Sequence, residues 1–262
     1  MMRVLQFSYS YLYRWVAYVG ELSIILGEAL YWMFVPPFKP QRFLKQAWRV
    51  GPGSLFIGCL VAFFLGMIIA LQMAYQMVKL SAEIYIPNVV GVSVTRELSP
   101  VLTSLIVAGR IGAGITAEIG TMVVTEQVDA LRAFAVNPVR YLVVPRFLAL
   151  VIMLPLLTVF ADLIGILGGY VICVHKLSLS SSLYWRTIEQ SLVVGDILVG
   201  LFKTVFFAAI IAIVGCHQGL KVKGGADGVG KATTSSVVHS FVFIILMDCL
   251  FTFVTYFLFE RR

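Results

Sequence analysis

The chain has 262 residues, of which 60% are hydrophobic and 13% carry a charge, against about 25% charged residues in an ordinary soluble domain. This composition excludes a water-soluble surface and predicts an integral membrane protein. The net charge of +7 does not indicate nucleic-acid binding, because the basic residues stand singly between apolar runs instead of clustering on one face.

The first 36 residues carry a polar stripe at helical spacing. Because a helix with several charges on one stripe is a poor membrane span, residues 1–36 are predicted to form an amphipathic helix that lies in the membrane interface. The alternative is a sixth span whose polar stripe packs against protein. The stripe consists of Arg3, Ser10, Arg14, Glu21 and Glu28.

Five apolar stretches follow, each long enough to cross a bilayer, which requires about 20 helical residues. The first is the clearest, since no charged residue lies between Arg49 and Lys79. The sequence therefore predicts an all-α integral membrane protein whose residues 1–262 form a single domain. The predicted transmembrane helices are residues 53–78, 87–119, 147–174, 197–220 and 237–259.

The basic residues indicate the orientation. Five spans place the two termini on opposite sides of the membrane. Twelve of the Lys and Arg residues outside the spans lie on the N-terminal side, and five lie on the other side. Because cytoplasmic loops collect Lys and Arg, we expect the N-terminus in the cytoplasm and the C-terminus outside.

A short cytoplasmic helix is predicted at residues 125–136, between the second and third spans. Glu126, Asp129 and Arg132 share one face at a spacing of three, while Leu131 belongs to an apolar face. Such a two-faced helix is suited to docking on a partner. A solvated connector against the membrane explains the same pattern equally well.

Residues 225–231, in a predicted loop at 224–236, match the first seven positions of a phosphate-binding P-loop. The match is rejected because Ala232 stands where a Ser or Thr is needed and no buried strand precedes the loop. The three histidines have no Cys or carboxylate partner at metal-ligand spacing. No metal site and no catalytic residues are therefore predicted.

Ionisable residues inside the spans are the main functional candidates, because each costs about 2.5–3.5 kcal/mol to insert at the centre of a span. Lys203 in the fourth span is expected to pair with Glu97 in the second, since both lie at similar depth. Asp248 is expected to lie deeper. The other members of this group are Arg96, Arg110, Glu118 and Asp162.

Arg96, Thr103 and Arg110 repeat every seven residues, which predicts one inward-facing polar stripe on the second span. We expect Arg96, Glu97 and Lys203 to line a cavity for an amphiphile with an anionic head. Asp162 and Asp248 are equally well explained by internal ion pairs. On the first span, an apolar wall with a polar handle is expected from Phe63, Phe64, Gln72 and Tyr75. Gly165 and Gly169 predict a close helix contact.

Several long blocks resemble the MlaE/YrbE permease family, the membrane subunits of ABC transporters that work with MCE-domain proteins. The resemblance covers roughly residue 53 to the C-terminus. The blocks are RELSPV at 96–101, AGRIG at 108–112, AEIGTM at 117–122, TEQVDAL at 125–131 with Asn137 and Pro138, and GVGKATT at 228–234 with Val237, Val238 and Asp248.

The resemblance implies a homodimeric permease of the bacterial inner membrane that moves phospholipid or a related lipid. It also implies separate ABC ATPase subunits that bind ATP and Mg, so that this chain needs no cofactor of its own. A periplasmic MCE-domain protein and a small STAS-like accessory subunit are the other implied partners.

Residue roles follow from the same resemblance. The coupling helix of the family corresponds to residues 125–134, so that Glu126, Gln127, Asp129 and Leu131 are expected to contact the ATPase. The charged residues near the lipid cavity correspond to Arg96, Glu97 and Lys203. Asp162 matches no family motif.

A different class of function stays open. An ion-coupled secondary transporter that uses Asp162 and Asp248 as proton sites is compatible with the same spans. It would depend on an ion gradient and on no ATPase.

Overall fold

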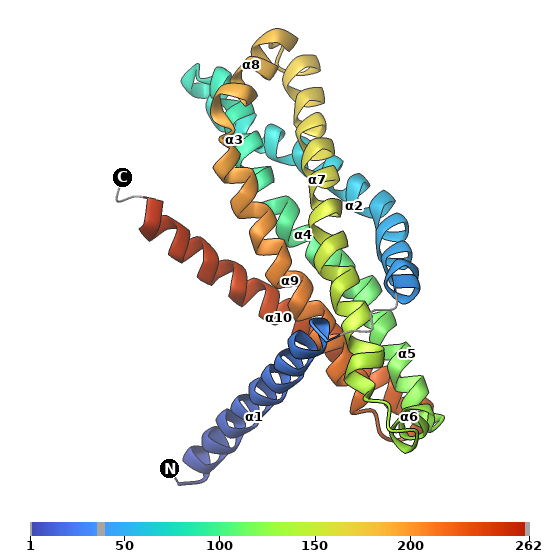
Figure 1. Cartoon of the computed structure of the whole chain (residues 1–262). Coiled ribbons are helices and arrows are strands. Elements are labelled where there is room, and N and C mark those ends of the chain that lie inside the picture. Colours follow the sequence, from blue (N-terminus) through green and yellow to red (C-terminus); the bar gives the residue numbers. More distant parts are fainter. Residues whose placement is uncertain (1, 36–39, 260–262) are drawn as a thin grey trace.

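The computed structural model describes residues 2–35 and 40–259, and every regular element within these ranges is a helix (Figure 1). The α-helices are α1 (Met2–Met33), α2 (Pro40–Met77), α3 (Ile86–Ser93), α4 (Ser99–Val107), α5 (Ala113–Val124), α6 (Gln127–Ala133), α7 (Val144–His175), α8 (Ser181–Ser191), α9 (Val194–Leu220) and α10 (Gly225–Phe259). Short 3-10 turns, η1 (Val78–Leu80) and η2 (Glu83–Tyr85), join α2 to α3.

Six segments of the described chain are long and apolar enough to cross a membrane. Five of them overlap the five predicted spans, which confirms an all-helical membrane protein, and the sixth is Trp15–Met33 within α1. The bundle has two ends, which we call the α6 end and the α8 end after the short helices that they carry (Figure 1).

The long helices begin before the predicted limits: α2 begins at Pro40 instead of residue 53, and α10 has a similar extension. Helix α10 begins at Gly225, so that residues 225–236, which were expected to form a loop, are helical. Figure 1 shows α10 leaning away from α9 as it leaves the α6 end. Charged and small polar residues at its start hid this extension, because a hydropathy pattern detects only the part of a helix that lies in lipid.

The N-terminal helix α1 uses its polar stripe to contact the bundle. Glu21 Oε2 lies 2.9 Å from His217 Nε2 and also pairs with Lys221. Asn137 Nδ2 donates to Glu28 Oε1 over 2.6 Å. The acidic residues of the predicted stripe therefore face protein at the α6 end. The side chains of the other stripe residues, Arg3, Ser10 and Arg14, lie outside the described part of the structure.

In the described part of the chain, three π-helical turns interrupt the helical register, namely η3 (Val94–Leu98), η4 (Ala108–Gly112) and η5 (Val139–Val143). A π-turn contains an extra residue compared with a turn of α-helix. Side chains seven residues apart on its two sides therefore no longer lie on one face of the helix. The first two lie between α3 and α5, within the second predicted span. They hold Arg96 and Arg110, the ends of the expected polar stripe.

Close contact between α2 and α7 depends on small residues. A Cβ atom on Gly66 would overlap the carbonyl oxygen of Gly165, and one on Gly168 would overlap the carbonyl oxygen of Phe63. Gly169 lies against Val90 and the hydroxyl of Tyr184. The close contact predicted from Gly165 and Gly169 is therefore present, and it is made with α2 and α3.

Candidate functional site

A buried lysine organises the polar interior of the bundle. Lys203 Nζ on α9 donates to Glu97 Oε2 over 2.5 Å, to Asp248 Oδ1 over 2.9 Å and to Thr252 Oγ1 over 2.9 Å. The lysine is 1% exposed. An ammonium group has three N–H donors, so that every donor of Lys203 has a partner. We call these four residues the Lys203 cluster.

The Lys203 cluster joins three elements of the second, fourth and fifth predicted spans. The expected pairing of Glu97 with Lys203 is present. The expectation that Asp248 lies deeper is wrong, because Asp248 bonds the same ammonium. The error arose because α9 begins at Val194, ahead of the predicted start at residue 197, and because α10 leans away from α9 (Figure 1). Residue counts from the predicted helix ends therefore gave different depths.

The cluster holds two carboxylates against one ammonium group. Its acidic side is partly open, since the side chains of Glu97 and Asp248 are 39% and 21% exposed. A buried cation with two acidic partners is well compensated. The exposed side of the cluster is thus acidic, and the buried lysine holds the two carboxylates together.

Arg96 has a partner that the sequence analysis missed. Its Nε lies 3.2 Å from Asp196 Oδ1 in the first turn of α9. The same carboxylate accepts a hydrogen bond from the backbone N–H of Val193, over 3.4 Å to Oδ2. An acidic residue in the first turn of a helix is a common cap, and this feature was the available clue to Asp196.

The expected polar stripe on the second span is divided between different neighbours. Arg96 faces α9, whereas Arg110 Nη1 donates to Ser54 Oγ on α2 over 3.1 Å. Thr103 is 4% exposed between them. The prediction of one continuous stripe is therefore wrong, and the π-turns η3 and η4 are the physical reason.

Gln72 and Tyr75 do not join the Lys203 cluster within one chain. Both side chains are exposed on α2, which packs against α7, α3 and α4. The ammonium group of Lys79 lies over the ring of Tyr75, 4.2 Å from the ring centroid.

A second ionic group lies toward the α6 end. Glu118 Oε2 accepts from Arg49 Nη1 over 2.8 Å and lies 3.0 Å from Arg146 Nη2. Arg146 is 5% exposed, and its Nη1 also donates to the carbonyl oxygen of Leu142. Glu118 therefore ties α5 to both α2 and α7, and it does so away from the Lys203 cluster.

Asp162 is buried in the packing of α7, beside the hydroxyl of Ser99. It is 8% exposed, and its Oδ1 has no hydrogen-bond partner among the residues that the structure describes. Among the described residues, Asp162 has no ion pair like the one that Lys203 forms with Asp248. Within residues 2–35 and 40–259, no three His, Cys, Asp or Glu side chains gather as a metal site.

Helix α6 has the two faces that the sequence predicted. Val128 is 2% exposed and Leu131 is partly buried on the core, whereas Asp129 and Arg132 pair on the outer face at 2.9 Å. Gln127 Nε2 donates to Thr125 Oγ1 over 3.0 Å. The helix is shorter than predicted, at Gln127–Ala133.

Sharp turns bound α6 on both sides. Glu126 and Ala135 have φ angles of 59° and 57°, in the left-handed region that L-residues seldom adopt. Phe134, at the end of the helix, is 81% exposed. The sequence analysis did not single out Phe134, although it lies within the corresponding family segment.

The chain is similar to known proteins over most of its length. The sequence profile of the family described as Permease MlaE matches residues 43–254. This chain belongs to that family. A probable ABC transporter permease of Rickettsia typhi is 42% identical over 234 residues, which cover 89% of this chain and 90% of the relative.

More distant organisms carry similar permeases. A probable ABC transporter permease of Synechocystis is 42% identical over 205 residues, or 78% of each chain. One from Pyropia yezoensis is 40% identical over 217 residues, which cover 83% of this chain and 81% of the relative. The permease is therefore a multi-pass membrane subunit of an ABC transporter, a class that works with an ATPase partner.

Proposed function

We propose that the permease moves phospholipid, or a closely related lipid, between the bacterial inner membrane and a periplasmic MCE-domain partner. The observation that carries the proposal is the Lys203 cluster, a group of charged side chains placed within the membrane spans. Such groups are costly in lipid and mark substrate paths. The family resemblance supplies the lipid substrate and the MCE partner.

The surroundings of the cluster suit an amphiphile. Beside Asp248, helix α10 exposes a continuous apolar surface with Ile245, Leu246 and Phe253 between 55% and 63% exposed. We infer that a second copy of the chain faces this surface, so that a homodimer encloses an apolar cavity with polar groups at one end. Gln72 and Tyr75 would contribute to the wall of that cavity from the partner side or at its entrance.

We infer that the lipid is held and released by an exchange of ion-pair partners. Lys203 holds Glu97 and Asp248 together, while Asp196 holds Arg96. An anionic head group competes with Asp196 for the guanidinium of Arg96, since arginine binds phosphate and carboxylate with the same donors. Movement of α9 relative to η3 would then release or capture the lipid without any covalent step.

The driving force would enter at α6. Its outer face is charged and its exposed Phe134 offers an aromatic anchor, a residue type that often dominates interfaces. In the proposed orientation the α6 end is cytoplasmic and meets the ATPase, the N-terminus is cytoplasmic and the C-terminus is periplasmic. The MCE-domain partner would meet the α8 end, and a STAS-like subunit would bind the ATPase side.

We propose that α1 lies in the membrane interface, and its contacts support this position. Glu21 meets the end of α9, and Glu28 meets the loop before η5. These positions are about 10 Å apart along α1, yet both partners lie at the α6 end. A helix with both contacts at one end of the bundle is better explained by an interfacial position than by a span.

An ion-coupled transporter remains the second candidate, because Asp162 is buried with an oxygen that has no partner in the described chain. Asp248 favours this candidate less, since it is engaged by Lys203. Transport that follows a proton gradient without the ATPase would support it.

The proposal is tested by the lipid that the purified complex retains. Lys203→Met leaves Glu97 and Asp248 facing each other without their cation. We expect phospholipid retained per complex, measured by mass spectrometry, to fall by about tenfold, the equivalent of 1.4 kcal/mol.

Lys223→Met is the matched control, because Lys223 is exposed at the α6 end and should retain lipid as the unmodified chain does. A folded Lys203→Met complex with unchanged lipid content and transport would contradict the proposal.

A further inference from the structure

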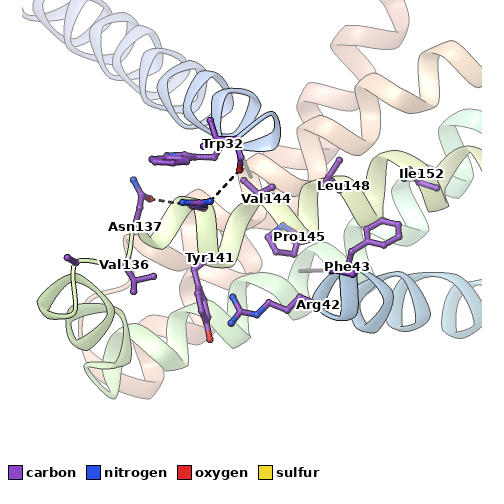
Figure 2. A pocket seen from close by; sticks show the side chains of 14 residues that line it. Trp32, Arg42, Phe43, Val136, Asn137, Tyr141, Val144, Pro145, Leu148 and Ile152 are labelled. Atoms are coloured by element: carbon purple, nitrogen blue, oxygen red, sulfur yellow. Dashed lines mark hydrogen bonds between the residues drawn. The ribbon is translucent and has the colours of Figure 1, made fainter. Parts of the chain in front are cut away.

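A separate cavity of about 610 Å³ lies at the α6 end, between the end of α1, the start of α2 and the start of α7 (Figure 2). Its volume falls within the range of small-molecule sites, about 300–1,000 Å³. None of the described residues that line it is acidic. The residues that matter below are Trp32, Arg42, Arg140, Tyr141, Leu148 and Ile152.

The polar end of the cavity holds two arginines on aromatic rings. The guanidinium carbon of Arg42 lies 3.7 Å from the centroid of the Tyr141 ring, and that of Arg140 lies 4.8 Å from the Trp32 ring. A guanidinium that stacks through its face keeps its N–H donors at its edge. Arg42 makes no ion pair with any residue that the structure describes, so that its edge is available for a bidentate oxyanion.

The other end of the cavity is apolar. Val144, Leu148 and Ile152 lie four residues apart on one stripe of α7, and Phe43 lies across from them (Figure 2). This stripe is about 12 Å long by the helical rise. Ile152 is 46% exposed, so that the apolar end opens at the outer surface of a membrane-spanning helix.

A phosphate beside the arginines with hydrocarbon along α7 matches a phospholipid, whereas free phosphate or a nucleotide would leave the apolar stripe unused. Basic pockets between transmembrane helices on the cytoplasmic side commonly take anionic lipid heads. The cavity is also far from the Lys203 cluster, because Lys203 lies about 26 Å along α9 from the end of this helix at the α6 end.

We propose that this cavity binds an anionic phospholipid of the leaflet at the α6 end, with its phosphate on Arg42 and Arg140 and its chains along Leu148 and Ile152. The bound lipid would join α1, α2 and the segment that follows α6. Ala135, which has a left-handed conformation, lines the same cavity, so that the lipid also supports the turn that ends α6.

The test compares lipid binding by full-length protein in nanodiscs of phosphatidylcholine with increasing phosphatidylglycerol, with bound lipid counted by native mass spectrometry. Arg42→Gln removes the stacked cation. We expect the preference for phosphatidylglycerol to fall by about tenfold or more, since charge-assisted hydrogen bonds are lost. Brominated phosphatidylglycerol should also quench the fluorescence of Trp32 less in this variant than in the unmodified protein.

Lys45→Gln is the matched control, because Lys45 is exposed on the same helix and does not line the cavity. General attraction to an anionic surface gives about fivefold for any cation, so that equal losses in the two variants would overturn the site. Displacement of the lipid by millimolar inorganic phosphate would overturn it as well.

Two further variants complete the design. Lys203→Met should still bind phosphatidylglycerol in the cavity at the α6 end. This variant therefore distinguishes a failure of the present proposal from a failure of the proposed transport cavity. Should Arg42→Gln not insert, Ile152→Trp keeps both charges and fills the apolar end, and retention of phosphatidylglycerol should again fall. Unchanged retention in a folded Ile152→Trp protein would contradict the proposal.

Discussion

The ion-pair partners of some residues in this permease can be predicted from the sequence, and those of others cannot. Lys203 and Glu97 were expected to pair because each is an isolated charge in an apolar helix, and an isolated charge in lipid requires a partner. Arg96 is adjacent to Glu97 in sequence but points elsewhere and bonds Asp196. Its partner depends on how η3 turns against α9, and no spacing rule contains that information.

Glu118 and Arg146 give a prediction at this scale. Glu118→Ala leaves the guanidinium of Arg146, which is 6% exposed at its side chain, without its carboxylate. Loss of one partner of a buried pair costs about 3–5 kcal/mol. Because the Glu118 side chain is 37% exposed, we expect a smaller loss of about 2–3 kcal/mol in the free energy of unfolding.

Unfolding of the purified protein in mild detergent, followed by circular dichroism, measures this loss. Arg49→Ala removes the other partner of Glu118. Because the Arg49 side chain is 52% exposed, this variant should lose less than about 1 kcal/mol in the free energy of unfolding. Equal losses for Glu118→Ala and Arg49→Ala would show that Arg146 does not depend on its carboxylate.

At the scale of elements, periodicity predicted where helices lie better than where they end. The two faces of α6 were visible as a three-residue spacing, and the structure has Val128 inside and Asp129 outside. The start of α10 and the π-turns were not visible. A helix that leaves the membrane loses its apolar pattern, and a π-turn changes the register without a distinctive residue type.

The charged face of α6 carries the second prediction. If it contacts the ATPase, the double variant Glu126→Lys and Asp129→Lys should lose ATPase co-purification by about tenfold or more, since like charges across an interface cost several kcal/mol. The variant should still insert, because both side chains are exposed. Affinity pull-down from solubilised membranes provides the measurement.

Phe134→Ala tests the same contact without a change of charge, and it should also weaken co-purification. Lys176→Glu at the α8 end serves as the control, because it changes charge away from α6. Full ATPase recovery with the double variant would remove α6 from the coupling path.

At the scale of the whole molecule, the segment that partly matches a phosphate-binding loop is the start of a long helix. Residues 225–231 lie at the start of α10, and Lys231 pairs with Asp227 on the same helix over 2.6 Å. We therefore expect the purified chain in nanodiscs to release phosphate from ATP at the background rate. The complex with its ATPase subunits is the positive control, and turnover by the chain alone would contradict this expectation.

The sequence by itself determined that this protein is an all-helical membrane protein, because the cost of placing polar groups in lipid restricts both composition and spacing. Its motifs also indicated the family, and its isolated charges indicated Lys203 and Glu97. Only the tertiary structure decided that Asp248 joins them, that Arg96 turns to Asp196, and that Arg42 and Arg140 line one cavity beside an apolar stripe. These contacts join residues from separate helices, and their geometry depends on helix tilt and π-turns, which leave no periodic trace in the chain.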